Sequence, residues 1–388
     1  MTNDELKRID AKIVDITRGI DFITLLTPVN QAAEKEKFFK SFHNGFEYNP
    51  VFEFKEKDLS DFRVALVDMR NTLDEKEPIE RLFIHKIVFL LGQIDLVECE
   101  DRRFTKLSEK LYGMPDKKGL DFAMKILATE VNRATFFPEE TVTPREMAEI
   151  MRQRLKALKI PWRVELSNKI VSKINVSGRD RVILVNAGLN YTPQEAERHK
   201  VHEIEVHVFR GMNGDHQPFS IFREGLAGHD EAEEALAILV EDILGCLELD
   251  LRQIKIYAGR YFAIHLALAN SFFDVFLRVR EYMPDELAYR IVERVKRGLK
   301  DTSAHGAFTR ELFYIRGIMR LEKFLENGGD LCSLYAGKVG FEDIKIVEKL
   351  LKDKILNPPS HMPAFLYAQD HRSICKHAGF MKMINDIY

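Results

Sequence analysis

The chain has 388 residues, 45% of them hydrophobic and 31% charged, which is the composition of an ordinary globular protein. A net charge of −3 gives no reason to expect nucleic acid or an anionic membrane as the main partner. The N-terminus is charged from Asp4 onward and lacks an apolar signal core, and no run of about 18 apolar residues could span a membrane. The four cysteines form no C-x-x-C pair and suit a reducing compartment. We therefore expect a cytoplasmic protein.

The first 160 residues are predicted to be mostly helical. In residues 4–25, apolar side chains recur at helical spacing, which predicts an amphipathic opening helix. Gly45, Asn49 and Pro50 then interrupt the pattern, so residues 43–57 are expected to form an extended strap on the core. Helical periodicity returns over residues 59–73, 78–102, 104–112 and 119–134.

A small sheet is predicted next. Three short stretches after Pro161 have the composition of strands: Arg163–Leu166, Ser172–Val176 and Arg181–Asn186. The turn at 177–180 favours a hairpin between the last two, and the apolar third stretch favours an inner strand. Thr192-Pro193-Gln194-Glu195 then forms a capping box with proline at the first helical position, which starts a helix that ends near Gly211.

That helix carries the sequence His202-Glu203-Ile204-Glu205-Val206-His207. Two imidazoles with a carboxylate after the first, and a downstream glutamate, are how a catalytic zinc is usually held on a helix. The histidines are five residues apart, about 140° around a regular α-helix, whereas the familiar zinc-peptidase pattern places them four apart. We therefore predict a local π-helical widening that brings both rings together. The alternative is two ordinary histidines on a regular helix with diverging rings.

The rest of the chain is predicted to be helical with few interruptions. Loops are expected at residues 212–220 and 301–308, and the helices are expected over residues 225–244, 251–282, 285–297 and 311–325. The tail is predicted to be helical over 341–388 with a break at Pro358-Pro359. The fold class is thus α+β and mostly helical, with a helical region at 1–160, a catalytic region at 161–345 and a tail at 346–388.

Six motifs follow one another in a recognisable order: HEIEVH at 202–207, FRGMNGDHQPF at 209–219, EGLA at 224–227, KRG at 296–298, DTS at 301–303 and FYIRG at 313–317. Their order and approximate spacing resemble the microtubule-associated tyrosine carboxypeptidases, a metallopeptidase family. Its bacterial relatives are known as QEGLA-motif proteins, and their name hints at a role in modulating expression. The resemblance is best over about residues 160–345, and its most specific part is HExxxH followed by EGLA.

The resemblance implies a zincin-like metallopeptidase core with the small sheet beside the HExxxH helix. It also implies a zinc ion held by His202, His207 and Glu224, with Glu203 as the general base. Three protein ligands leave zinc an open position, as in catalytic sites. Two departures from the family's pattern bear on substrate preference: Arg223 replaces the Gln of QEGLA, and Glu205-Val206 replaces smaller residues.

A carboxypeptidase must also bind a free α-carboxylate, which requires a fixed cation. The resemblance makes Lys296 and Arg297 the candidates, with Thr302 adding a hydroxyl. Arg210, three residues after His207, is a further candidate cation, and Tyr314 is expected to donate a hydrogen bond to the developing oxyanion. Each of these residues also has an ordinary alternative. Lys296 and Arg297 would only oppose the helix dipole, Arg210 would form a surface salt bridge, and the hydroxyl of Tyr314 would bond to backbone.

Three functions are compatible with these residues. The first is a zinc metallocarboxypeptidase that removes a C-terminal residue from a peptide or protein, and the resemblance implies that this residue is tyrosine or phenylalanine. The second is a non-catalytic regulator that is stabilised by its metal and binds a partner, and the third is a zinc hydrolase of non-peptide amides. Glu203 favours catalysis, because a regulator has no need for a base beside a three-ligand metal.

Overall fold

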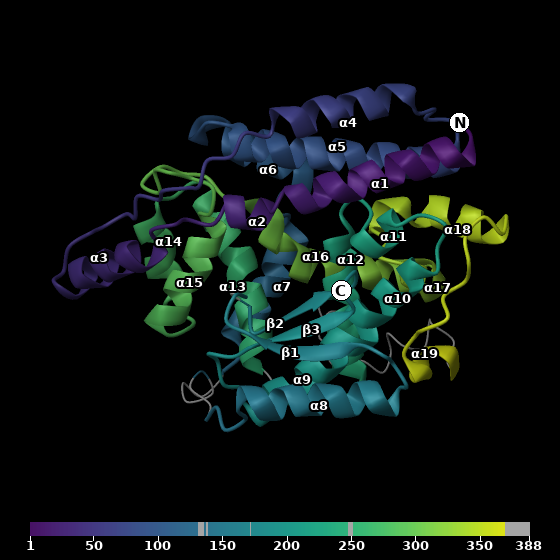
Figure 1. Cartoon of the computed structure of the whole chain (residues 1–388). Coiled ribbons are helices and arrows are strands. Elements are labelled where there is room, and N and C mark those ends of the chain that lie inside the picture. Colours follow the sequence, from purple (N-terminus) through teal and green to yellow (C-terminus); the bar gives the residue numbers. More distant parts are fainter. Residues whose placement is uncertain (131–135, 137–138, 171, 247–250, 369–388) are drawn as a thin grey trace. The chain divides into compact units, whose positions relative to one another are not determined.

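The computed structural model describes residues 1–130, 136, 139–170, 172–246 and 251–368 (Figure 1). By contacts the chain divides into two units that interleave along the sequence. Unit 1 comprises Met1–Glu75, Phe83–Phe136 and Ile254–Arg316, and unit 2 comprises Lys76–Leu82, Phe137–Gln253 and Gly317–Tyr388. The division into three regions expected from the sequence, 1–160, 161–345 and 346–388, stays a prediction. The part of the predicted tail after residue 368 lies outside the described residues. Within the described part, no helix is long and apolar enough to cross a membrane.

Unit 1 is built from helices in its described residues. They are α1 (Asn3–Gly19), α2 (Phe22–Leu25), α3 (Gln31–His43), α4 (Ser60–Thr72), most of α5 (Pro78–Glu98), α6 (Asp101–Tyr112), α7 (Lys117–Ala128), α13 (Leu251–Ala267), α14 (Phe272–Val279), α15 (Asp285–Val295) and the 3₁₀ turn η3 (Thr309–Leu312). The opening helix starts at a capping box between Thr2 and Glu5 and buries its apolar stripe. The expected strap is also present: Phe52 is buried, and its N–H donates to the carbonyl of Lys300 at 2.9 Å.

Unit 2 contains the predicted sheet. Its strands are β1 (Arg163–Ser167), β2 (Ile174–Ser177) and β3 (Val182–Asn186), in the order β1-β3-β2. β3 pairs in parallel with β1 and antiparallel with β2, so the expected hairpin and the expected inner strand are both confirmed. β3 lies between the two other strands, and its side chains Val182, Ile183 and Val185 are all buried. A buried inner strand of this kind has a nearly continuous apolar sequence.

The helices of unit 2 surround this sheet and the motif. They are α8 (Pro144–Ala157), α9 (Pro193–Val201), the π-helical segment η2 (His202–Val208), α10 (Phe209–Asp215), α11 (Ile221–Glu224), α12 (His229–Ile243), most of α16 (Phe313–Glu326), α17 (Leu331–Tyr335), the 3₁₀ turn η4 (Phe341–Asp343), α18 (Ile344–Lys352) and α19 (Ala364–Ala368). α8 packs against β1 and β3, while η2 contacts both β2 and α12 (Figure 1). The mostly helical fold with one small sheet is therefore confirmed.

Candidate metal centre

The HExxxH motif lies in the middle of one continuous helical rod, α9–η2–α10. Thr192 caps this rod by accepting from the N–H of Glu195, with Pro193 at the first position, as the sequence predicted. From His202 to Val208 the rod is a π-helix. A π-helix closes its hydrogen bonds over five residues, so residues five apart share a face as residues four apart do in an α-helix. The predicted widening is confirmed.

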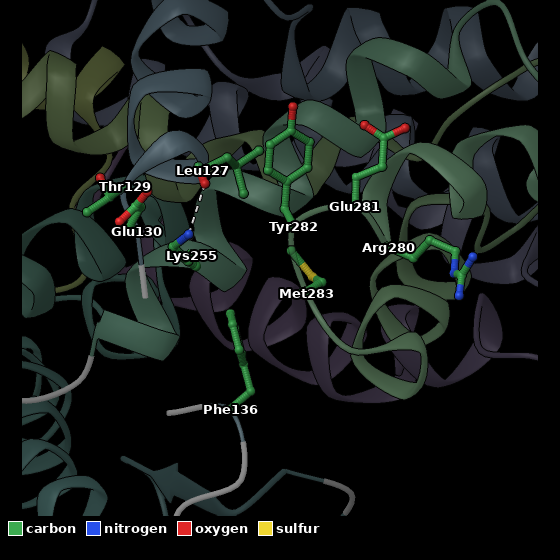
Figure 2. Close-up of a pocket in the computed structure, with 9 residues that line it drawn as sticks. All are labelled: Leu127, Thr129, Glu130, Phe136, Lys255, Arg280, Glu281, Tyr282 and Met283. Carbon is green, nitrogen blue, oxygen red and sulfur yellow. Dashed lines mark hydrogen bonds between the residues drawn. The ribbon is translucent and has the colours of Figure 1, made fainter. Parts of the chain in front are cut away.

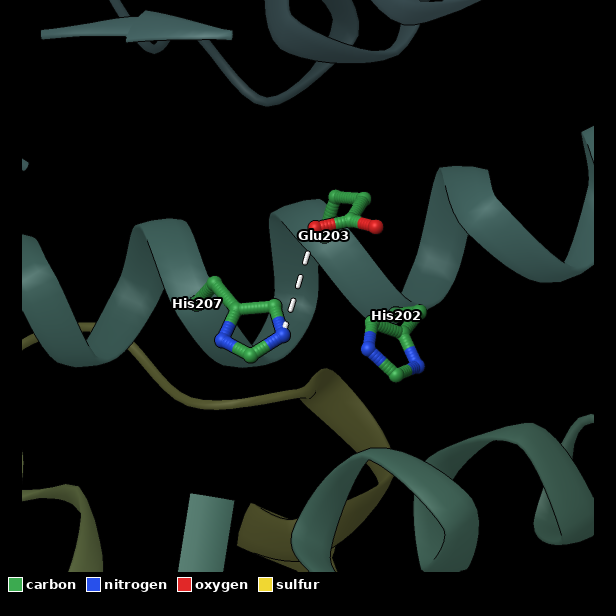
Figure 3. Close-up of side chains that lie close together, drawn as sticks. All are labelled: His202, Glu203 and His207. Carbon is green, nitrogen blue, oxygen red and sulfur yellow. Dashed lines mark ion pairs between the residues drawn. The ribbon is translucent and has the colours of Figure 1, made fainter. Parts of the chain in front are cut away.

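The two imidazoles converge as a result. The centroids of the His202 and His207 rings lie 4.9 Å apart. Ligand atoms of these two residues and of Glu203 all lie within 4.8 Å of one another (Figure 3). Nitrogen ligands of a tetrahedral zinc lie roughly 3.3 Å apart, given metal–nitrogen distances of about 2.0–2.1 Å. A small rotation of the side chains therefore suffices to hold an ion, and the alternative of diverging rings on a regular helix does not apply.

Each imidazole meets a carboxylate of α12 at its Nδ1 atom. His202 Nδ1 lies 2.6 Å from Glu241 Oε1, a short hydrogen bond, and His207 Nδ1 lies 3.1 Å from Glu233 Oε1. Burial disfavours the charged ring of His202, but the hydrogen bond to Glu241 and the surrounding carboxylates outweigh it and raise the pKa of His202 to about 9. In both rings Nδ1 faces a carboxylate of α12, so Nε2 is the nitrogen left to bind a metal.

Glu203 is buried and ionised between imidazoles. Its Oε1 accepts from His199 Nδ1 at 3.1 Å, and its Oε2 lies 3.9 Å from His207 Nε2. Burial would raise the carboxyl pKa, but the hydrogen bond from His199 and the nearby imidazoles lower the pKa of Glu203 to about 2. His199 thus orients this carboxylate, because the rod turns its side chain inward.

Glu224 ends the short helix α11, directly before a sharp turn. Gly225 has φ of 108°, and a Cβ there would lie 2.2 Å from the ring of His229, so only glycine suits this position of the EGLA motif. Glu224 Oε1 accepts two hydrogen bonds from Arg223, at 3.0 and 3.2 Å. The carboxylate of Glu224 is not a member of the His202–Glu203–His207 group.

A second carboxylate faces the metal position from α12. Glu234 Oε2 lies 3.8 Å from His202 Nε2, on the side of the ring opposite to Glu241. Burial raises the pKa of Glu234, and the nearby Glu233 and Glu203 carboxylates add to this rise, whereas the two imidazoles oppose it. The sequence analysis did not single out Glu234.

Arg210 supports the same site from behind. Its side chain is fully buried and donates to three backbone carbonyls, those of Leu334 and Gly337 at 3.1 Å and of Val339 at 2.7 Å. Its Nη1 lies 3.7 Å from Glu233. Arg210 therefore ties the rod to the segment 334–339 and neutralises Glu233. Substrate binding by Arg210 stays a prediction, and these bonds do not support it.

The donor set fits zinc. Two imidazole nitrogens and neighbouring carboxylate oxygens are the ligands that zinc takes in catalytic sites. The imidazole of His202 is also held by a hydrogen-bonding carboxylate, as metal-binding histidines usually are. Three of the four cysteines are described, and all three are free. His202, His207 and one of Glu224 and Glu234 would hold the ion.

Comparison with known proteins assigns the chain to a family. The family model described as microtubule-associated tyrosine carboxypeptidase matches residues 36–385. The chain belongs to this family. The resemblance expected from the six motifs is thereby confirmed, and the match extends well beyond residues 160–345.

Individual relatives are distant. The chain is 24% identical over 375 residues to the mouse protein "Putative tyrosine carboxypeptidase MATCAP2", which covers 94% of the chain and 62% of that protein. It is 23% identical over 334 residues to the rat microtubule-associated tyrosine carboxypeptidase 1, covering 83% of the chain and 61% of the relative. With the mouse form of the latter, identity is 31% over 149 residues, 37% of the chain and 31% of the relative. The chain thus spans about three fifths of the length of the first two relatives.

The family motifs KRG and DTS lie in unit 1. Lys296 is fully buried, and its Nζ donates to the carbonyls of Asn270 and Ala304, each at 2.8 Å. Burial lowers the pKa of Lys296 to about 8. Thr302 is buried too, and its Oγ1 donates to the carbonyl of Pro50 at 2.6 Å. In this structure both side chains fix loops, and substrate binding by either stays a prediction.

Arg297 and Tyr314 lie in unit 1 as well. Arg297 is half-buried, its Nε has no hydrogen-bond partner among the described residues, and burial together with Arg294 lowers its pKa to about 10. Arg210 Nη1 also lacks a hydrogen-bond partner among the described residues, but Arg210 is fully buried, whereas Arg297 is half-buried. Tyr314 stacks between Tyr257 and Phe313, at centroid distances of 4.3 and 4.4 Å. Its role toward an oxyanion stays a prediction.

A separate cavity of about 410 Å³ also lies in unit 1 (Figure 2). Phe136 and Met283 contribute apolar surface, and Lys255 Nζ donates to the carbonyl of Leu127 at 2.9 Å. Arg280, another lining residue, is paired with Asp285. The polar groups named here are thus already bonded within the protein, and the cavity holds none of the predicted site residues.

Sequence reasoning missed the carboxylates of α12. Glu233, Glu234 and Glu241 stand in the segment HDEAEEALAILVEDI, which is otherwise apolar and is buried along most of its length. Charged residues are seldom buried unless they are paired, so a buried helix with this many glutamates was the available signal. Nε2 of His229, the first residue of the same helix, lies 3.7 Å from Glu233 Oε2.

Proposed function

We propose that this protein is a zinc-dependent carboxypeptidase that hydrolyses the C-terminal peptide bond of a peptide or protein and releases tyrosine or phenylalanine. The observation that carries this proposal is the π-helical segment, because it turns His202 and His207 to one face with Glu203 beside them. Membership of a family of tyrosine carboxypeptidases supports the reaction and the released residue. The helices around a small sheet are compatible with a zincin-like core.

Zinc bound there would supply a water molecule with a pKa lowered to about 7. Glu203 would accept the proton of that water on its carboxylate and then deliver it to the leaving amine. His199 holds this carboxylate in place through Oε1, which leaves Oε2 on the side of His207. General acid–base help of this kind contributes about 10²–10⁴ in rate.

Substrate recognition requires a cation for the α-carboxylate and a donor for the oxyanion. Arg297 is the preferred cation, because it is only half-buried and its Nε lacks a partner among the described residues, and Lys296 and Thr302 would shape the same loop. Tyr314 is the proposed donor to the oxyanion. The partner is thus the free C-terminus of a peptide or protein.

The test combines metal content with peptide trimming. The full chain, loaded with zinc, is incubated with peptides ending in Tyr, Phe or Ala, and release of the last residue is followed by mass spectrometry. Glu203→Gln should keep one zinc per chain and lose at least about 100-fold in rate. Glu197→Gln, an exposed residue of the same rod, is the matched control and should behave as the wild type. Stoichiometric zinc without hydrolysis of any peptide would instead favour a metal-stabilised regulator.

The third ligand can be assigned by zinc binding alone. We retain Glu224, which the EGLA motif implies, and expect Glu224→Ala to lose more than the roughly 10–100-fold in affinity that supporting residues typically contribute. Glu234→Ala should lose less, because Glu234 would then only line the site. Affinities are measured by competition with a chelator of known affinity. The reverse order of the two variants would make Glu234 the ligand.

A further inference from the structure

One helix, α12, places a carboxylate behind each of the two candidate metal-binding imidazoles. Glu241 Oε1 lies 2.6 Å from Nδ1 of His202, and Glu233 Oε1 lies 3.1 Å from Nδ1 of His207. His202, the first histidine of the motif, meets Glu241, and His207 meets Glu233, which comes before Glu241 in the chain. This reversed order is expected when η2 packs antiparallel to α12. The first contact is a hydrogen bond, whereas the second is an ion pair, because Glu233 Oε1 has no hydrogen-bond partner among the described residues.

Each of these carboxylates is buried and has its own cation. Glu241 is fully buried and lies 3.2 Å from Arg198 Nη1. Glu233 is 4% exposed and lies 3.4 Å from Lys338 Nζ and 3.7 Å from Arg210 Nη1. A buried carboxylate without such a partner would be costly, so the surrounding residues are arranged to keep both charges at the rings.

The consequence lies in the geometry of the rings. An ionised carboxylate can only accept a hydrogen bond, so Nδ1 of His202, which is bonded to Glu241, must carry a proton and donate it. In a neutral imidazole the lone pair then belongs to Nε2, which is the atom on the side of the metal position. Fixing that tautomer and the ring angle before a metal arrives reduces the reorganisation that binding requires.

We propose that Glu241 and Glu233 are positioning residues. Glu241 holds His202 through a hydrogen bond from Nδ1 and so commits its Nε2 to the metal, and Glu233 holds His207 from the same side as an ion-pair partner. This inference rests on the proposed function, because it assigns a role toward the same ion. It adds a requirement that the HExxxH and EGLA motifs do not contain: a second buried helix with two glutamates eight residues apart.

The experiment measures zinc affinity by chelator competition and identifies the coordinating nitrogen by ¹¹³Cd–¹⁵N coupling in histidine-labelled, cadmium-loaded full chain. The variants are Glu241→Gln, Glu241→Ala, Glu233→Gln and Glu233→Ala. Each Ala variant should lose about 10–100-fold in zinc affinity. Glu241→Gln should lose less, because its amide oxygen still accepts from Nδ1, whereas Glu233→Gln removes the charge of an ion pair and should lose about as much as Glu233→Ala. The Ala variants should also weaken or shift the coupling at the unsupported ring.

The matched control is Glu231→Ala, which removes a glutamate of the same helix that pairs with Arg320 at 2.9 Å. It should bind zinc as the wild type does, and circular dichroism should show all variants folded. Wild-type affinity and unchanged Nε2 coupling in folded Ala variants would overturn this inference while leaving the proposed function intact. A wild-type chain that binds no zinc would overturn both. Equal losses in Glu231→Ala would show a structural effect of α12 and also overturn it.

Discussion

At the scale of single residues, the site depends on which side of each ring a carboxylate occupies. His202 has a glutamate at each ring nitrogen: Glu241 at Nδ1 and Glu234 near Nε2. Glu241 orients the ring, whereas Glu234 would either bind the metal together with Nε2 or compete with the metal for it. The protonation state of a buried carboxylate depends on its surroundings, because burial raises its pKa and nearby cations lower it. Glu203 and Glu234 lie in one cluster, yet their pKa values move in opposite directions.

A buried glutamate outside the site gives a clear pH prediction. Glu322 is 5% exposed, its Oε1 has no partner among the described residues, and burial with the nearby Glu326 raises its pKa to about 7. Between pH 4.5 and 7 the folded chain then holds a proton that the unfolded chain has released, so stability falls as pH rises through this range. Glu322→Gln should remove this fall and stabilise the chain by roughly 1–3 kcal/mol at pH 8.

The measurement is urea unfolding of wild type and variant at pH 5, 6, 7 and 8. The exposed Glu326→Gln serves as the comparison, since its side chain reaches solvent and should leave most of the pH dependence in place. If Glu322→Gln has the same pH dependence as the wild type, Glu322 titrates normally and its burial carries no penalty.

At the scale of elements, sequence patterns predicted the parts whose causes are local. The capping box at Thr192 and the apolar run at Val182–Asn186 each act through neighbours in the chain, so the start of the rod and the inner strand were predicted correctly. The rod continues to Asp215, four residues beyond the predicted end near Gly211. The π-helical segment was predicted as well, because the five-residue spacing of two candidate ligands requires it. Glu241 and Glu233 were missed, since their pairing with the rings depends on how α12 packs, which no local pattern encodes.

Close packing of α10 on α11 makes a further prediction. A Cβ at Gly214 would lie 2.5 Å from the carbonyl oxygen of Phe222 and 2.6 Å from backbone atoms of Arg223, and backbone cannot yield as a flexible side chain does. Gly214→Ala should therefore push α11 away and cost roughly 1–3 kcal/mol of stability. Because Glu224 is the last residue of α11, zinc affinity should fall too.

The control for this variant is Gly188→Ala, whose Cβ would meet only the side-chain oxygen of Asn186 at 3.5 Å, an ordinary contact. It should be near neutral in thermal unfolding and in zinc binding. A Gly214→Ala chain that loses stability but binds zinc with wild-type affinity would separate α11 from the metal site and weaken the case for Glu224.

At the scale of the whole molecule, unit 2 assembles its site from segments far apart in sequence. The rod belongs to residues 193–215, yet Arg210 and Asn213 bond to carbonyls between Leu334 and His361. One of these bonds reaches the predicted tail at 346–388, since Asn213 Nδ2 donates to the carbonyl of His361 at 2.7 Å. Such long-range bonds carry no sequence signal, because a backbone carbonyl looks the same at every position.

Metal binding should therefore stabilise this unit as a whole. Zinc that binds the folded site alone adds RT ln(1 + [Zn]/Kd), about 4 kcal/mol when free zinc is 1,000 times Kd. Amides of η2 and α12 should then exchange with solvent up to about 1,000-fold more slowly in hydrogen exchange with zinc than with chelator. Amides of α1 and α3, in unit 1, are the internal reference and should gain less, since neither helix carries a proposed ligand. The double variant His202→Ala/His207→Ala should show no zinc-dependent change anywhere. Protection that rises equally in this double variant would place the responsible zinc outside the HExxxH motif.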